Sequence, residues 1–213
     1  MNNMIKANKV GTMPECHDPY APKPVRLASL FPYYGKNYIN GTWMGYPDRQ
    51  CYFQTSPNDG SQDMGSYPQT ISLDIGLAVQ SAKAAFKVWR KLSRIQRGEM
   101  FYKLAYLLQD NIQEYSVLLS FETGKHIDEA RADIVEAVHM CQYVAGTARM
   151  SAGDVITSEI PEKDAFVLRK PKGVCAVITP WNFPCAIPIW LMGPSLIEGN
   201  TVVFKPSEDS PAT

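Results

Sequence analysis

Two short clusters near the end of the printed sequence hold the residues best suited to binding or chemistry. They consist of Thr179, Pro180, Trp181 and Asn182, and of Lys205, Pro206, Ser207 and Glu208. These residues are mostly polar, aromatic or charged, whereas the segments before them are apolar. Ligands of open parallel sheets bind at the carboxyl ends of the strands. The two clusters therefore predict a ligand-binding site if each follows a strand of one sheet.

Two β-rich segments and a connecting helix are expected to position these clusters. Residues 173–179 form a short apolar run between a glycine and Pro180, which is typical of a strand buried on both faces of a parallel sheet. Thr201–Lys205 is a second such run. Residues 183–199 are long enough for a crossover helix that ends at Gly199, so we expect a right-handed βαβ unit.

The middle of the chain predicts helices. Asp74 is the expected N-cap of a first helix, in which apolar residues recur at intervals of three and four as far as Trp89. A second helix shows the same period at Phe101, Leu104, Leu107 and Leu108. A third, around residues 118–121, ends at the C-cap glycine Gly124. These helices each present one apolar face to a core.

A fourth, longer helix carries an apolar stripe from Ile127 to Ala148, and Gly153 is expected to close it. Residues 155–169 then read as two strands around a turn at residues 161–164. We therefore expect a hairpin directly after the longest helix.

The amino-terminal part is expected to be irregular and then β-rich. Residues 1–34 contain five prolines and predict an irregular arm. Asn40-Gly41 predicts a hairpin turn; the sequence Asn40-Gly41-Thr42 is also a glycosylation sequon, but the turn is favoured because residues 1–30 contain no secretory signal. A strand at residues 51–55 and a polar loop at residues 56–69 are expected to follow.

Composition excludes several classes of protein. The 213 residues include 21 Lys plus Arg and 21 Asp plus Glu without a basic run, which argues against a nucleic-acid partner. Five cysteines, an odd number without a CxxC pair, argue against a disulfide framework or zinc site and favour a reducing cytoplasm. Residues 173–197 are uncharged, but four prolines and Asn182 argue against a membrane span.

Other motifs in the chain are weaker. Glu136 and His139 have the spacing of a di-iron bundle motif, but the second such pair that these sites need is not visible, so a surface or partly buried histidine is the favoured interpretation. Residues 60–65 have P-loop-like glycine spacing without the following Lys-Ser/Thr, and no GxGxxG occurs. The sequence therefore predicts no metal and no conventional Rossmann phosphate loop.

The two clusters and their flanks resemble the aldehyde dehydrogenase superfamily. The resemblance lies in Ile178–Pro184 (ITPWNFP) and Gly199–Glu208 (GNTVVFKPSE), at the family's spacing. It extends back through Glu122–Lys125 (ETGK), the helix that contains Trp89 and the Tyr38–Trp43 hairpin. Leu191 departs from the lysine that many members carry after the tryptophan, with little consequence for the chemistry.

The resemblance implies an α/β fold in which amino-terminal helices lead into the start of a parallel Rossmann-like sheet. Residues 35–154 and 170–213 would form part of an NAD-binding domain, after the arm of residues 1–34. Residues 155–169 would form a protruding hairpin used for homo-oligomerisation. Whether the complete protein is a dimer or a tetramer is not evident from the sequence.

The resemblance also implies a mechanism. A cysteine thiolate attacks an aldehyde carbon, and hydrogen-bond donors stabilise the resulting oxyanion before hydride leaves for the nicotinamide. Asn182 is the implied donor, because its neutral amide offers N–H groups. The aldehyde itself is not identified, because the substrate tunnel is lined largely by residues outside these motifs.

The remaining cluster residues are implied to bind NAD. Lys205 and Glu208 would grip the adenosine ribose, and a carboxylate there disfavours the 2′-phosphate of NADP. The other implied cofactor-binding residues are Ile178, Thr179, Pro180, Trp181 and Ser207.

The family takes its nucleophilic cysteine, general-base glutamate and nicotinamide-side glycine loop from segments downstream of the Lys-Pro-Ser-Glu motif. The chain is therefore expected to be an incomplete amino-terminal portion that is inactive alone. Cys175 is expected to be buried and inert, and Cys185 is the one alternative nucleophile, because a helix start lowers a thiol's pKa. A non-catalytic nucleotide-binding or interaction module is the alternative to an enzyme, but it is less favoured because the motif residues are intact.

Overall fold

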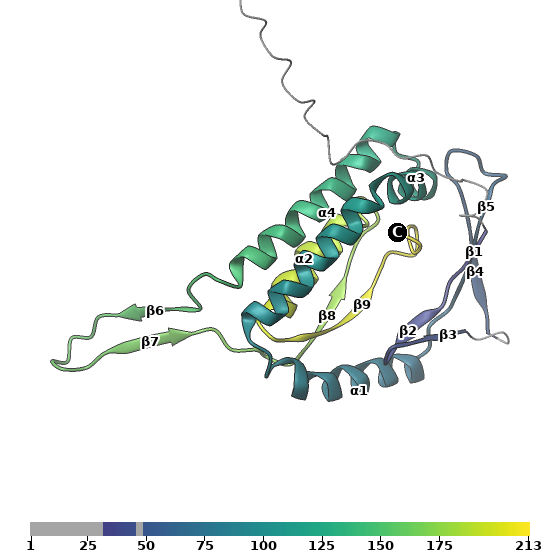
Figure 1. Cartoon of the computed structure of the whole chain (residues 1–213). Coiled ribbons are helices and arrows are strands. Elements are labelled where there is room, and N and C mark those ends of the chain that lie inside the picture. Colours follow the sequence, from purple (N-terminus) through teal and green to yellow (C-terminus); the bar gives the residue numbers. More distant parts are fainter. Residues whose placement is uncertain (1–31, 46–48) are drawn as a thin grey trace, which may run out of the picture.

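The computed structural model describes residues 32–45 and 49–213 and shows an α/β arrangement (Figure 1). Its helices are α1 (Ser72–Trp89), α2 (Arg94–Asp110), α3 (Ile112–Thr123), α4 (Ile127–Thr147) and α5 (Ala186–Ile197). Its strands are β1 (Tyr33–Tyr34), β2 (Asn37–Ile39), β3 (Thr42–Met44), β4 (Cys51–Thr55), β5 (Asp63–Pro68), β6 (Gly153–Ile156), β7 (Ala165–Leu168), β8 (Val174–Ile178) and β9 (Thr201–Lys205).

The predicted βαβ unit is confirmed. β8 and β9 pair in parallel, from Val174 opposite Thr201 to Ile178 opposite Lys205, and α5 connects them. Helices α1 and α5 both contact this two-stranded sheet. Burial on both faces is wrong for β8, because successive side chains point to opposite faces: Val177 is 5% exposed and Ile178 is 71% exposed.

Helix α4 is the centre of the core. It packs against α2, α3 and α5, and the predicted stripe is buried from Ala130 to Ala148, whereas Ile127 at its start is exposed. Glycines let the neighbouring helices approach closely: a Cβ at Gly193 of α5 would lie 2.7 Å from Cγ2 of Val144. The apolar period therefore predicted the buried face correctly.

Two predicted helix boundaries are wrong. The N-cap of α1 is Ile71, and Asp74 is the third helical residue, whose carboxylate accepts a hydrogen bond from the Ile71 backbone N–H at 3.2 Å. Helix α4 ends at Thr147, whereas Gly153 begins β6. Gly153 is needed there because a Cβ would lie 1.9 Å from the carbonyl oxygen of Val167 on the paired strand.

The predicted turns agree with the structure. Asn40 and Gly41 have φ values of 53° and 74° between the antiparallel strands β2 and β3, as a type I′ turn requires. Gly124, with φ of 77°, is the C-cap of α3. The local sequence is sufficient at these positions because the backbone conformation itself selects glycine or asparagine.

The expected loop at residues 56–69 is wrong in its second half, where β5 pairs antiparallel with β4 and parallel with β1. Gly65 has φ of 129°, and a Cβ there would lie 1.8 Å from the carbonyl oxygen of Tyr33. Tyr33 and Tyr34 were expected to belong to the irregular arm but form β1. Residues 1–31 of that arm lie outside the described residues.

The hairpin of β6 and β7 extends away from the helices, as expected for residues 155–169 (Figure 1). Val155, Phe166 and Leu168 on it are exposed. Among residues 32–45 and 49–213, no helix combines the length and the apolar character needed to cross a bilayer. In these same ranges, no group of three His, Cys, Asp or Glu side chains is placed to hold a metal ion.

Candidate functional site

The structure brings the two predicted clusters together at one edge of the β8–β9 sheet. Ile178 and Lys205 are register partners, and the backbone N–H of Thr179 donates to the carbonyl of Lys205 at 3.3 Å. We call residues 179–185, which lead from β8 to α5, the Asn182 loop. Residues 206–213, which follow β9, are the Glu208 loop. Both loops begin at the carboxyl ends of parallel strands, where open α/β sheets bind ligands.

Lys205 and Glu208 form an ion pair on the surface. Their side-chain nitrogen and oxygen are 2.5 Å apart, and the side chains are 57% and 68% exposed. The hydrogen bond from Lys205 holds the pKa of the Glu208 carboxyl below its usual value, so Glu208 is a carboxylate at neutral pH. Water screens so exposed a pair and limits what it adds to stability. The pair is therefore open to a ligand.

Ser207 lies inside the Glu208 loop. It is buried, its hydroxyl accepts a hydrogen bond from the backbone N–H of Asp209 at 3.2 Å, and its carbonyl accepts one from Ser210 at 3.3 Å. The structure thus gives Ser207 a part in the turn that presents Glu208.

The residues of the β8 end differ in exposure. Ile178, Pro180 and Trp181 are exposed and form an apolar surface beside Lys205. Thr179 is buried, and its hydroxyl has no hydrogen-bond partner among the described residues. A ligand at this edge would therefore meet apolar side chains on one side and a charged pair on the other.

Asn182 is exposed in the middle of its loop. Its backbone carbonyl accepts a hydrogen bond from the Nζ of Lys125, the second residue after α3. The same Nζ lies 4.1 Å from the centroid of the Phe183 ring. The main chain of this loop is thus tied to the end of α3, whereas the Asn182 side chain faces outward.

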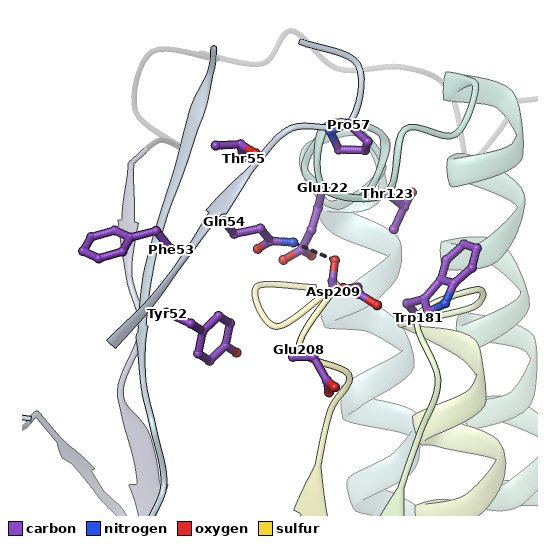
Figure 2. Close-up of a pocket in the computed structure, with 10 residues that line it drawn as sticks. All are labelled: Tyr52, Phe53, Gln54, Thr55, Pro57, Glu122, Thr123, Trp181, Glu208 and Asp209. Atoms are coloured by element: carbon purple, nitrogen blue, oxygen red, sulfur yellow. Dashed lines mark hydrogen bonds between the residues drawn. The ribbon is translucent and has the colours of Figure 1, made fainter. Parts of the chain in front are cut away.

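A pocket of about 610 Å³ lies between the two loops and β4 (Figure 2). Trp181 and Glu208, one predicted residue from each cluster, both line it. Its complete lining is Tyr52, Phe53, Gln54, Thr55, Pro57, Glu122, Thr123, Trp181, Glu208 and Asp209. The pocket therefore joins the predicted site to β4 and to the end of α3.

Two pocket residues that sequence reasoning missed hold the Glu208 loop. The Nε2 of Gln54 donates to the carbonyl of Asp209 at 2.6 Å. The buried Glu122 carboxylate accepts the backbone N–H groups of Ala212 and Thr213 at 2.7 and 2.8 Å. Burial raises the pKa of Glu122, and these hydrogen bonds oppose the rise. Glu122 belongs to the ETGK motif, which marks it in the sequence, whereas nothing in the sequence singles out Gln54.

Two of the described cysteines, Cys141 and Cys185, lack the lowered pKa of an activated thiol. Burial raises the pKa of the Cys185 thiol to about 12, so the lowered pKa expected at the helix start is wrong. The reason is that apolar surroundings and the nearby Asp133 both disfavour a thiolate there. Burial raises the pKa of Cys141 to about 11. Cys175 is only partly buried, less than expected for the middle of a strand.

The residues present fit a dinucleotide cofactor. A carboxylate and an ammonium group next to an exposed apolar and aromatic surface offer hydrogen bonds to a ribose and contact to a ring system. Glu208 and Lys205 supply the polar groups, and Ile178 and Trp181 supply the apolar surface. Polar groups for hydrogen bonding and apolar side chains for contact with a ring therefore lie at the same edge of the sheet.

These features define an α/β protein with a candidate ligand site at the carboxyl ends of two parallel strands. The sequence matches the aldehyde dehydrogenase family over residues 46–213, and the chain belongs to this family. It is 36% identical to the alpha-ketoglutaric semialdehyde dehydrogenase of Bacillus subtilis over 177 residues, which are 83% of this chain and 36% of that protein. The chain thus spans about a third of the length of this relative.

Relatives with different cofactors are similar to the chain. The D-glyceraldehyde dehydrogenase (NADP(+)) of Thermoplasma acidophilum is 31% identical over 178 residues, which are 84% of this chain and 36% of that protein. The crystal structure of PnpE in complex with nicotinamide adenine dinucleotide matches with a TM-score of 0.77 and 36% identity. That match covers 83% of this chain and 36% of PnpE. These matches confirm the predicted family and fold class and leave the choice between NAD and NADP open.

Proposed function

We propose that this chain forms the cofactor-binding side of an enzyme that oxidises an aldehyde to a carboxylic acid with NAD. The observation that carries the proposal is the placement of the Asn182 loop beside the exposed Lys205–Glu208 pair. Family membership and the names of the relatives support the same reaction class. The bound dinucleotide would supply the hydride acceptor, and the residues of this chain would bind it and orient the substrate.

Glu208 and Lys205 are proposed to hold the adenosine ribose. The carboxylate accepts hydrogen bonds from ribose hydroxyls, and Lys205 donates to them from the other side. Glu208 is ionised, so it repels a 2′-phosphate and favours NAD over NADP. Ile178, Pro180 and Trp181 would form the wall along the cofactor, whereas buried Thr179 and Ser207 would support that wall and the ribose grip from below.

Asn182 is proposed to donate its side-chain N–H to the oxygen of the aldehyde as negative charge develops on it. The amide is exposed and neutral, so it offers a donor without a proton to lose. Loss of one oxyanion-hole donor costs about 3 kcal/mol of transition-state stabilisation in acyl-transfer enzymes. Since burial raises the pKa values of Cys141 and Cys185, we propose that neither is the attacking thiolate. Because the chain spans about a third of the length of its relative, we propose from family membership that the thiolate, the general base and the nicotinamide-side loop belong to the remaining part of a longer protein.

We further propose that the protein acts in the cytoplasm as a homo-oligomer. The cysteines among the described residues are free thiols, which suits a reducing compartment. The exposed apolar side chains of the β6–β7 hairpin suit contact with a second copy. Light scattering of the purified protein with and without Phe166→Asp tests the oligomer, because a charge there should reduce the mass.

Glu208→Gln in the full-length protein that contains this chain tests the ribose assignment. The variant should bind NAD more weakly and discriminate less against NADP, because it removes the charge that repels the 2′-phosphate. Calorimetric titration with both cofactors measures the two affinities. Glu159→Gln, at an exposed acid on the β6–β7 connection, is the matched control. An unchanged ratio of NAD to NADP affinity in Glu208→Gln would remove Glu208 from the ribose site.

A further inference from the structure

Two charged residues outside the predicted clusters hold the Asn182 loop at its middle and at its end. Lys125 donates from Nζ to the carbonyl of Asn182 and lies over the Phe183 ring. Asp133 of α4 accepts the backbone N–H of Ala186, the first residue of α5, on Oδ1 at 2.8 Å. The loop is therefore fixed at its middle by an ammonium group and at its end by a carboxylate.

Lys125 and Asp133 also face each other. The Nζ of Lys125 lies 4.0 Å from Oδ2 of Asp133, and their side chains are 17% and 0% exposed. Among the described residues, this Oδ2 has no hydrogen-bond partner. The ammonium group of Lys125 is the positive charge that faces it. Removing two charges from water is costly, and apolar residues of similar volume often stabilise a fold as well. A role in the fold alone does not explain why charges occupy these positions.

The contacts made by Lys125 and Asp133 restrict the direction in which the Asn182 side chain can point. A hydrogen bond to the carbonyl of Asn182 fixes the peptide plane between Asn182 and Phe183, because that plane is rigid. The hydrogen bond from Ala186 to Asp133 fixes the start of α5 four residues later. With both points held, few backbone conformations remain for Asn182, and the direction of its exposed side chain is restricted.

We propose that Lys125 and Asp133 are positioning residues that orient the Asn182 amide toward the oxygen of the substrate. This inference rests on the proposed function of Asn182. Misplacement of a catalytic group by about 1 Å can slow a reaction roughly a hundredfold. Loss of either charge therefore lowers kcat, whereas affinity for NAD, whose proposed ribose contacts lie on Lys205 and Glu208, changes less.

A double-mutant cycle in the full-length protein tests the proposal. Lys125→Met and Asp133→Leu are each made alone and in the Asn182→Ala background, and kcat and the calorimetric Kd for NAD are measured. In the otherwise unchanged protein, each variant should lower kcat roughly 10- to 100-fold. In the Asn182→Ala background, the same changes should have little further effect on kcat, because no amide remains to be oriented. Lys103→Met, at an exposed lysine of α2, is the matched control.

The outcomes separate this inference from the proposed function. If Asn182→Ala leaves kcat unchanged, the oxyanion role of Asn182 is wrong. If Asn182→Ala lowers kcat but Lys125→Met lowers it by the same factor in both backgrounds, Lys125 does not act through Asn182 and the positioning role is overturned. Should Lys125→Met fail to fold, Lys125→Gln, whose side chain is uncharged and one bond shorter than that of lysine, carries the same comparison.

Discussion

The Asn182 loop and the Glu208 loop leave the same sheet edge but are held in different ways. The Glu208 loop presents a carboxylate that pairs with Lys205 at the end of β9, and Gln54 and Glu122 hold its main chain. The Asn182 loop presents one neutral amide, and the partly buried Lys125 and the buried Asp133 hold its main chain. From this difference we infer that the exposed charge lies where the proposed cofactor would bind, whereas the charge behind the Asn182 loop would orient a neutral group.

The largest expected effect is a complete loss of activity when residues 1–213 are studied by themselves. Neither loop supplies a thiolate, so this chain alone should oxidise no aldehyde with NAD or NADP. Absorbance at the reduced-nicotinamide band is the measurement. Turnover that disappears in Cys185→Ser would contradict the statement that neither loop supplies a thiolate, and it would make Cys185 the nucleophile. Turnover that survives Cys185→Ser would indicate a contaminating enzyme.

Asn182→Ala in the full-length protein should lower kcat by about a hundredfold and leave NAD affinity nearly intact. The amide is expected to act mainly when charge develops on the substrate oxygen, so binding of the ground state is hardly affected. Steady-state kinetics and calorimetry together separate the two quantities. A fall in NAD affinity that matches the fall in kcat would mean that Asn182 also binds the cofactor. Catalysis and cofactor binding would then not be divided between the two loops.

Gln54→Ala should have the opposite signature, with a larger effect on the cofactor than on kcat. It removes a hydrogen bond of 2.6 Å to the Asp209 carbonyl next to Glu208. A hydrogen bond of this kind contributes about 1 kcal/mol, which corresponds to roughly a fivefold weaker NAD affinity. Gln80→Ala, at an exposed position of α1, is the control. A kcat that falls more than the affinity would assign Gln54 to the other loop.

The smallest effect concerns pH. Burial raises the pKa of Asp133 and of Glu122 above their ordinary values of 3.8 and 4.5. The folded state therefore binds more protons than the unfolded state in this window, so stability falls as pH rises from these values through the raised pKa values. Urea midpoints of the wild-type protein, Asp133→Asn and Glu122→Gln between about pH 4 and pH 7 measure the trend. Each variant should reduce the dependence of the urea midpoint on pH. An unchanged dependence would show that burial does not raise the pKa values of Asp133 and Glu122.

Short-range patterns predicted most of the fold. The turn at Asn40-Gly41, the C-cap at Gly124 and the stripe of α4 are set by residues close in sequence, and all are confirmed. Strand β5 was missed because its sequence, DMGSYP, contains glycine and proline and lacks a β pattern. Its partners are β4 and the distant Tyr33–Tyr34, and the pairing becomes evident only when these segments meet.

The sequence also predicted some features of the site and missed others. Parallel pairing brings the two clusters to one sheet edge, so the sequence pattern was sufficient for their proximity. Lys125 lies 57 positions from its partner Asn182, and Asp133 lies 53 positions from its partner Ala186. No local sequence pattern connects residues so far apart in the chain. The expected low pKa of Cys185 failed for a related reason: the helix start is local, but the burial that dominates comes from distant segments.

The contact between Gly193 and Val144 limits which changes the gene can accumulate. Any nucleotide change that replaces a glycine by another amino acid adds a Cβ, and here that atom would lie 2.7 Å from a branch of Val144. Valine in a helix has one strongly preferred rotamer and cannot turn aside. Alanine at position 193 is therefore expected to cost less stability after residue 144 has become smaller, so the order of the two mutations sets the stability of the intermediate variant.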